Sequence, residues 1–203
     1  MTEILHAIGE LSGFIGGAIG IATGLPQALR VRKLGHTDGL ELSPWLLMFT
    51  MYAGWAAFGL LHNAFAIWFF NALTVLTTAL VIVAIRGNRI SSYLLMAGLV
   101  TAIGSLVLFG PELLVNIVLL ILTASRVPQL IRSWINRDRV KPTAVSISSL
   151  VVALSSMAFW MAYAILTENP LVILSTSIAI ATTVATALLE AHIARHAKAK
   201  NRL

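Results

Sequence analysis

The chain has 203 residues, of which 58% are hydrophobic and only 11% are charged. Soluble domains are roughly half apolar and a quarter charged, so this composition excludes a soluble globular protein and indicates an integral membrane protein. The formal net charge is +6, but the basic residues are scattered in short gaps between apolar runs, which argues against a contiguous nucleic-acid-binding stripe. The chain contains no cysteine, which excludes disulfides and thiolate metal sites.

Seven apolar runs are long enough to cross a bilayer, because a helix needs about 20 apolar residues to span about 30 Å of hydrocarbon. In chain order these runs are 8–30, 44–63, 65–85, 91–109, 112–132, 144–166 and 170–190. We therefore predict an all-α membrane protein with seven transmembrane helices.

The distribution of Lys and Arg predicts the orientation of these helices. The gaps after Leu61, Phe109 and Leu166 contain no Lys or Arg, and all 14 basic residues lie at the opposite helix ends. Short loops rich in Lys and Arg stay in the cytoplasm. We therefore expect the N-terminus outside, the C-terminus in the cytoplasm, and the protein in the plasma (inner) membrane.

The two halves of the chain match each other in sequence. The matched positions are Pro26-Gln27 with Pro128-Gln129 at an offset of 102 residues, and Trp55 with Trp160 and Phe58 with Tyr163 at an offset of 105. An insertion in the intervening loop explains the change of offset, since loops absorb extra length at small cost. Each half contains three predicted spans, and the run 91–109 returns the chain to its starting face between them.

The sequence thus predicts a 3+1+3 arrangement with two parallel repeats. Its parts are a first three-helix bundle at 1–88, a linker transmembrane helix at 89–110, a second three-helix bundle at 111–192 and a basic cytoplasmic tail at 193–203.

Two Pro-Gln motifs at the inner ends of the first and fifth spans of a 3+1+3 chain resemble the PQ-loop superfamily. Within it, the chain is most similar to the SWEET sugar facilitators, which are built from parallel repeats. The resemblance covers nearly the whole chain. It implies hinge prolines near the inner ends of spans 1, 2, 5 and 6: Pro26, Pro44 and Pro128 match this pattern, whereas Ser149 occupies the fourth position.

The resemblance also implies which residues face the solute. An asparagine is expected in spans 3 and 7; Asn71 matches the first, and Thr176 occupies the second. The aromatic positions of spans 2 and 6 are the matched tryptophans. The full set of candidate substrate-binding residues is Asn71, Thr176, Trp55, Trp160, Ser156, Thr23 and Ser125, and the candidate hinge or gate residues are Pro26, Gln27, Pro44, Pro128 and Gln129.

The chemistry of each of these residue types is compatible with either a functional or a structural role. A proline inside a helix frees a carbonyl and bends the axis, which serves either a moving hinge or a static packing kink. An indole face suits the C–H surface of a sugar ring, but it also packs a core. The Asn71 amide either lines a pocket or ties two helices together.

Two further features of the sequence concern structure rather than chemistry. The glycines of the first span, from Gly13 to Gly24, recur at four-residue spacings, and this pattern predicts close helix packing. Arg126 lies well inside its span, where it either snorkels to the inner interface or pairs with Asp138 or Glu190. We favour a structural role for Arg126 over a functional one.

No Asp or Glu lies in the middle of any predicted span, and this bears on the transport mechanism. Proton-coupled carriers need buried ionisable relays, so we expect facilitated diffusion. No nucleophile or metal-ligand arrangement is present, so we expect neither an enzyme nor a cofactor. The expected partners are a small neutral solute and membrane lipids, with no nucleic acid, and a homo-oligomer is left open.

The sequence therefore predicts a SWEET-like facilitator that moves a mono- or disaccharide by alternating access. Two alternatives stay open. One is a carrier for a small amino-acid-like solute; the other is a PQ-loop lipid scramblase or an accessory protein for lipid-linked sugars.

Overall fold

A computed structural model describes residues 2–34, 42–124, 127–135, 137 and 147–200. Every regular element within these residues is an α-helix. The helices are α1 (Thr2–Leu34), α2 (Leu42–Leu61), α3 (Phe65–Arg86), α4 (Ile90–Phe109), α5 (Glu112–Thr123), α6 (Val127–Ile135), α7 (Ile147–Leu166) and α8 (Pro170–Lys200).

Several of these helices are long and apolar enough to span a membrane. Within the described part of the chain, the segments that meet this condition are Glu3–Ile21, Leu42–Leu61, Phe65–Arg86, Ile90–Phe109 and Pro170–Ile193. The apolar segments Glu112–Thr123 and Leu150–Leu166 are shorter. The all-helical fold and its apolar helices agree with the predicted membrane protein.

The predicted fifth span is not a single described helix. The sequence favoured one run over 112–132, but α5 ends at Thr123 and α6 begins at Val127. Pro128 lies in the first turn of α6, where its missing N–H removes no helical hydrogen bond. In the described part of the chain, the span predicted over 112–132 is therefore represented by two helices.

The α2–α3 and α7–α8 connections have the same backbone geometry. Asn63 and Glu168, which lie 105 residues apart, have positive φ angles of 52° and 53°. In each turn the next residue donates its backbone N–H to a carbonyl five residues earlier, at 2.8 Å in the first turn and 2.9 Å in the second. The offset found in the sequence therefore reappears as a repeated turn.

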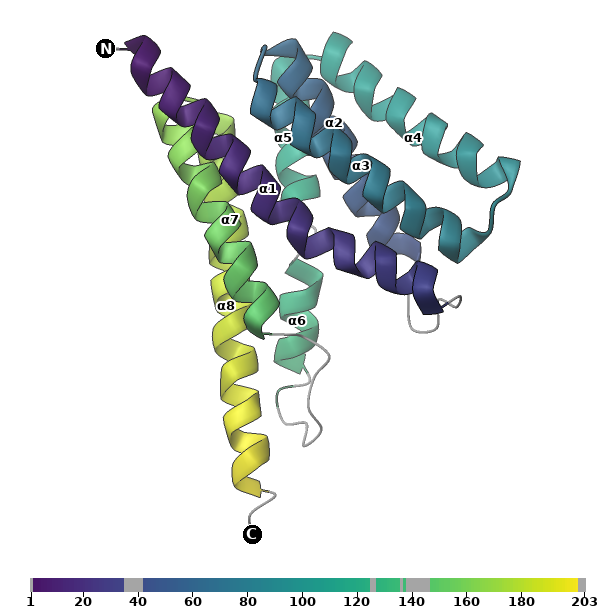
Figure 1. The fold of residues 1–203 in the computed structure, drawn as a ribbon, viewed down its shortest axis with the longest axis vertical. Coiled ribbons are helices and arrows are strands. Elements are labelled where there is room, and N and C mark those ends of the chain that lie inside the picture. The colour runs from purple at the N-terminus through teal and green to yellow at the C-terminus, as the bar shows by residue number, and fades with distance from the viewer. Residues whose placement is uncertain (1, 35–41, 125–126, 136, 138–146, 201–203) are drawn as a thin grey trace.

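Six segments of the bundle pack in a closed ring (Figure 1). Successive contacts join α1 to α3, α3 to α2, α2 to α5, α5 to α8, α8 to α7, and α7 back to α1. We call these helices the helix ring. Helix α4 packs against α2 and α3 from outside, and α6 packs against α8.

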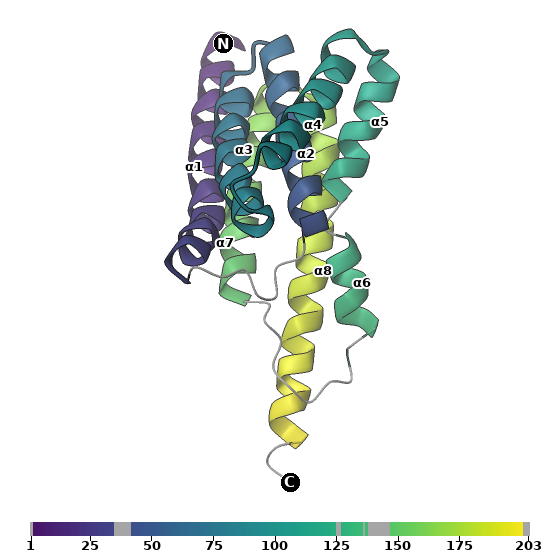
Figure 2. The same cartoon turned by 90° about the vertical axis from the view of Figure 1, so that its right-hand side faces the viewer.

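Among the described connections, those with and without basic residues lie at different ends of the bundle. Figure 2 shows the N-terminus and the α2–α3 and α4–α5 connections at one end and the C-terminus at the other. The α3–α4 connection, which carries Arg86 and Arg89, joins the opposite ends of those helices.

Glycines bring α1 close to both of its neighbours in the ring. A Cβ on Gly17 would overlap the Phe70 ring of α3, and a Cβ on Gly13 would lie 2.8 Å from Ala66 Cβ. On the side of α7, a Cβ on Gly16 would lie 3.1 Å from Phe159 Cβ. The close packing predicted from the glycine spacing is confirmed at these positions.

Candidate functional site

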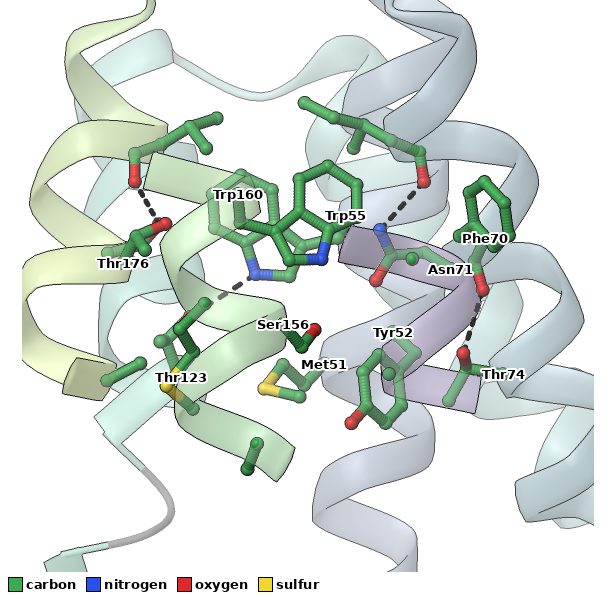
Figure 3. Close-up of a pocket in the computed structure, with 18 of the residues that line it drawn as sticks. Met51, Tyr52, Trp55, Phe70, Asn71, Thr74, Thr123, Ser156, Trp160 and Thr176 are labelled. Atoms are coloured by element: carbon green, nitrogen blue, oxygen red, sulfur yellow. Dashed lines mark hydrogen bonds between the residues drawn. The ribbon is translucent and has the colours of Figure 1, made fainter. Parts of the chain in front are cut away.

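A central cavity of about 190 Å³ lies inside the helix ring. Residues from α1, α2, α3, α5, α7 and α8 line it, so every helix of the ring contributes to its wall (Figure 3). An engineered protein cavity of about 150 Å³ holds one benzene molecule. The central cavity in this conformation therefore has room for a single six-membered ring with small substituents.

Five of the predicted substrate-binding residues line the central cavity: Trp55, Asn71, Ser156, Trp160 and Thr176. They come from α2, α3, α7 and α8, so both halves of the chain supply them. The side chain of Thr23 on α1 and the whole of Ser125 lie outside the described residues.

The two tryptophans are held by matching aromatic contacts. Trp55 packs edge-on against Phe58 with ring centroids 5.4 Å apart and planes at 75°. Trp160 packs against Tyr163 with centroids 5.5 Å apart and the same angle. Edge-to-face contacts between aromatic rings fix their orientation, so each indole is presented to the cavity by the residue one helical turn further on.

Asn71 makes its hydrogen bond within its own helix. Its Nδ2 atom donates to the Ile67 carbonyl of α3 at 2.7 Å. Among the described residues, Asn71 Oδ1 has no donor partner, and the side chain is only half-buried. The amide therefore does not tie α3 to a neighbouring helix, which was the structural alternative for this residue.

Hydroxyl groups add acceptor capacity to the wall. Thr74 donates to the Phe70 carbonyl at 2.7 Å, Ser175 donates to the Val172 carbonyl at 3.1 Å, and Ser156 donates to the Gly16 carbonyl at 2.7 Å. A hydroxyl that donates its hydrogen keeps lone pairs that accept. These oxygens can therefore receive hydrogen bonds from a polar solute.

The central cavity is uncharged. None of the described residues that line it is Asp, Glu, Lys, Arg or His. A buried ion without a counter-charge is strongly unfavourable. The chemistry of this wall therefore suits a neutral solute with an apolar face and several hydrogen-bonding groups.

Two acidic residues in the helices bond to protein groups away from the cavity wall. Glu10 on α1 accepts a hydrogen bond from the Ala66 backbone N–H at 3.0 Å, in the first turn of α3. Glu190 on α8 is 1% exposed, and its Oε1 atom accepts from Ser133 Oγ of α6 at 2.5 Å. The sequence placed Glu190 toward a helix end but gave no sign of its burial.

The candidate hinge residues occupy different kinds of position. Pro26 and Gln27 lie within α1, which continues past them and bends in its C-terminal part (Figure 1). Pro44 is exposed in the first turn of α2, where proline frees no carbonyl of the preceding turn. Pro128 and Gln129 lie in the first turn of α6. The side chains at 26, 27, 128 and 129 and all of Arg126 lie outside the described residues.

The predicted substrate-binding set lacks four polar residues of the wall: Tyr52, Thr74, Thr123 and Ser175. Tyr52 precedes Trp55 by three positions and Thr74 follows Asn71 by three, and residues at this spacing share a helix face. That rule could have identified both. Thr123 belongs to the wall because α5 packs against α2, which is a contact that no local pattern predicts.

Two comparisons with known proteins found no match for this chain. No family model matches the chain, and a search of curated proteins found no match.

Proposed function

We propose that this protein is a SWEET-like facilitator that carries a small neutral polyhydroxy solute, of the size of a monosaccharide, across a membrane by alternating access. The observation that carries the proposal is the uncharged central cavity, where two matched tryptophans meet the polar groups of Asn71, Ser156 and Thr176. Indole faces suit the C–H surface of a sugar ring, and the amide and hydroxyl groups suit its hydroxyls.

The volume of the cavity narrows the solute class. About 190 Å³ accommodates one six-membered ring, so we favour a monosaccharide over a disaccharide. A zwitterionic amino acid would need charged partners for its ammonium and carboxylate groups. The wall offers none among its described residues, so this alternative is less favoured.

The arrangement of the helices supports the two-repeat mechanism. The repeated turn at Asn63 and Glu168 supports two parallel repeats, and the position of α4 outside the ring supports its role as a linker helix. In this interpretation α1 to α3 form one repeat and α5 to α8 the other, with the solute between them. The basic helix ends would face the cytoplasm.

The position of the polar groups among the six helices of the ring favours a carrier over a lipid scramblase. A scramblase needs a polar groove that opens to lipid along the side of the protein, because headgroups must move while acyl chains remain in hydrocarbon. Here the polar side chains lie within a ring of helices that contact one another in succession. This supports the transport of a solute that is smaller than a lipid.

An uptake experiment tests the proposal. The purified protein is reconstituted in liposomes, and the uptake of radiolabelled D-glucose, sucrose and alanine is compared with the flipping of a fluorescent lipid. We expect saturable uptake of D-glucose above the level in protein-free liposomes and little uptake of the others. Lipid flipping without uptake of any neutral solute would support the scramblase alternative and refute the carrier.

A further inference from the structure

The two matched tryptophans differ in their hydrogen bonding. Trp55 Nε1 donates to Thr123 Oγ1 at 3.2 Å, and Thr123 in turn donates to the Leu119 carbonyl of its own helix at 2.9 Å. Trp160 Nε1 has no acceptor among the described residues. In Figure 3 only one indole nitrogen carries a dashed line, which is the bond to Thr123.

The cause of this difference lies at one pair of matched positions. Thr123 precedes Pro128 by five residues, and Ile21 precedes Pro26 by the same number. Both residues line the central cavity. Threonine offers an oxygen that accepts a hydrogen bond, whereas isoleucine offers none. The first-repeat indole therefore has an acceptor in the protein, whereas the second-repeat indole has none among the described residues.

An indole N–H inside a protein usually finds a partner, because leaving a donor unpaired is costly. Water or a solute oxygen in the cavity can supply that partner for Trp160. Asn71 Oδ1 is also without a donor partner among the described residues and lines the same cavity. The cavity thus offers an unused donor from α7 and an unused acceptor from α3.

We infer that Trp160 Nε1 is the donor that orients the solute and that Trp55 serves only as an apolar platform. Thr123 and Ile21 are the positioning residues that cause this difference, because only threonine offers an acceptor to an indole. The inference rests on the proposed function and sharpens it. A solute that engages both Trp160 and Asn71 must accept and donate hydrogen bonds. Hydroxyl groups do both, so a polyol fits better than an ether or a ketone, which only accept, or a protonated amine, which only donates.

Hydrogen exchange of the indoles tests the difference without any solute. The full-length protein is labelled with ¹⁵N-tryptophan in lipid nanodiscs, and each of its five indole signals is assigned by a single Trp→Phe substitution. We expect Trp160 N–H to exchange about tenfold faster than Trp55 N–H, because only the latter is hydrogen-bonded to the protein. Equal protection of the two indoles would overturn the inference.

Substitutions at the positioning pair should reverse the pattern. Thr123→Val removes the acceptor and should speed Trp55 exchange, whereas Ile21→Thr introduces one and should slow Trp160 exchange. Ile21→Val, which has nearly the shape of threonine without its hydroxyl, is the matched control and should leave Trp160 exchange as in the wild type. If Ile21→Thr and Ile21→Val behave alike, Ile21 does not determine the state of Trp160.

Experiments with D-glucose distinguish a failure of this inference from a failure of the proposed function. We expect the sugar to shift and protect the Trp160 indole signal but not that of Trp55, and we expect Trp160→Phe to raise the concentration for half-maximal uptake about tenfold, more than Trp55→Phe does. Uptake accompanied by protection of Trp55 alone would refute the inference while leaving the carrier intact. If no solute is taken up but the two indoles exchange as expected, the proposed function is refuted, whereas the difference in hydrogen bonding between the two indoles is confirmed.

Discussion

Ser156 of α7 donates its hydroxyl hydrogen to the backbone carbonyl of Gly16 in α1 at 2.7 Å. One turn away, Ser12 of α1 donates in the opposite direction to the Phe159 carbonyl of α7 at 2.9 Å. Hydroxyls of this kind tie helices together where hydrocarbon offers no other partner. The pair joins the N-terminal and C-terminal halves of the chain on the side of the cavity where glycines allow the closest approach.

The packing of α1 against α3 likewise depends on the absence of a side chain at Gly17. We expect Gly17→Ala to destabilise the folded protein by about 1–3 kcal/mol, because the added methyl group overlaps the Phe70 ring. Thermal unfolding in detergent measures the effect. Gly98→Ala on α4 is the matched control: a Cβ there meets nothing within 4 Å. Equal melting temperatures for the two variants would contradict the packing described for α1.

Asn71 should matter for uptake rather than for folding. Asn71→Ala removes an unused acceptor from the cavity wall and a hydrogen bond within α3. We expect a loss of about fivefold to tenfold in D-glucose uptake with a nearly unchanged melting temperature. Leu76→Ala serves as the control, because Leu76 lies on the same helix and is 62% exposed. A wild-type rate of uptake by the Asn71 variant would show that Asn71 does not bind the solute.

Glu10 should stabilise the start of α3. The residue before α3 is Ala64, whose side chain makes no capping hydrogen bond, and Glu10 of α1 accepts the Ala66 N–H instead. We expect Glu10→Ala to cost about 1 kcal/mol of stability and to speed hydrogen exchange at the Ala66 amide. Glu3→Ala, at an exposed position of α1, is the control. If both variants melt at the wild-type temperature, the cap contributes nothing measurable.

Transport should not depend on a proton gradient. The described residues of the cavity wall include no carboxylate or histidine, and proton-coupled carriers use such groups as relays. We expect the initial rate of D-glucose uptake into liposomes to stay the same when an imposed pH gradient is collapsed with an ionophore. A strict requirement for the gradient would mean that a titratable group takes part in the cycle.

Local patterns in the sequence were sufficient for the fold class and for much of the candidate site. The apolar runs predicted the helical segments, because a membrane-spanning helix needs a set length of apolar residues. The offset of 105 residues identified Trp55 and Trp160 as a pair, and their aromatic contacts agree to within 0.1 Å in centroid distance. Asn71 and Thr176 were predicted from the resemblance to the SWEET facilitators, and both line the central cavity.

Other features depended on atoms that are distant in the sequence. Glu10 caps α3 from 56 residues away, and Glu190 is buried because α6 packs against α8 beside it. The break between α5 and α6 also departed from the predicted continuous span. Each of these outcomes depends on what surrounds a residue in space, which the periodicity of one helix does not specify.

The sequence by itself determined that this chain is helical and apolar, because composition and spacing are properties of single segments. The tertiary structure decided how the positions that match between its two halves differ. It placed Thr123 Oγ1 at 3.2 Å from Trp55 Nε1, whereas Trp160 Nε1 has no acceptor among the described residues. A hydrogen bond forms only when donor and acceptor meet at the right distance and angle, and only the packing of α5 against α2 brings that about.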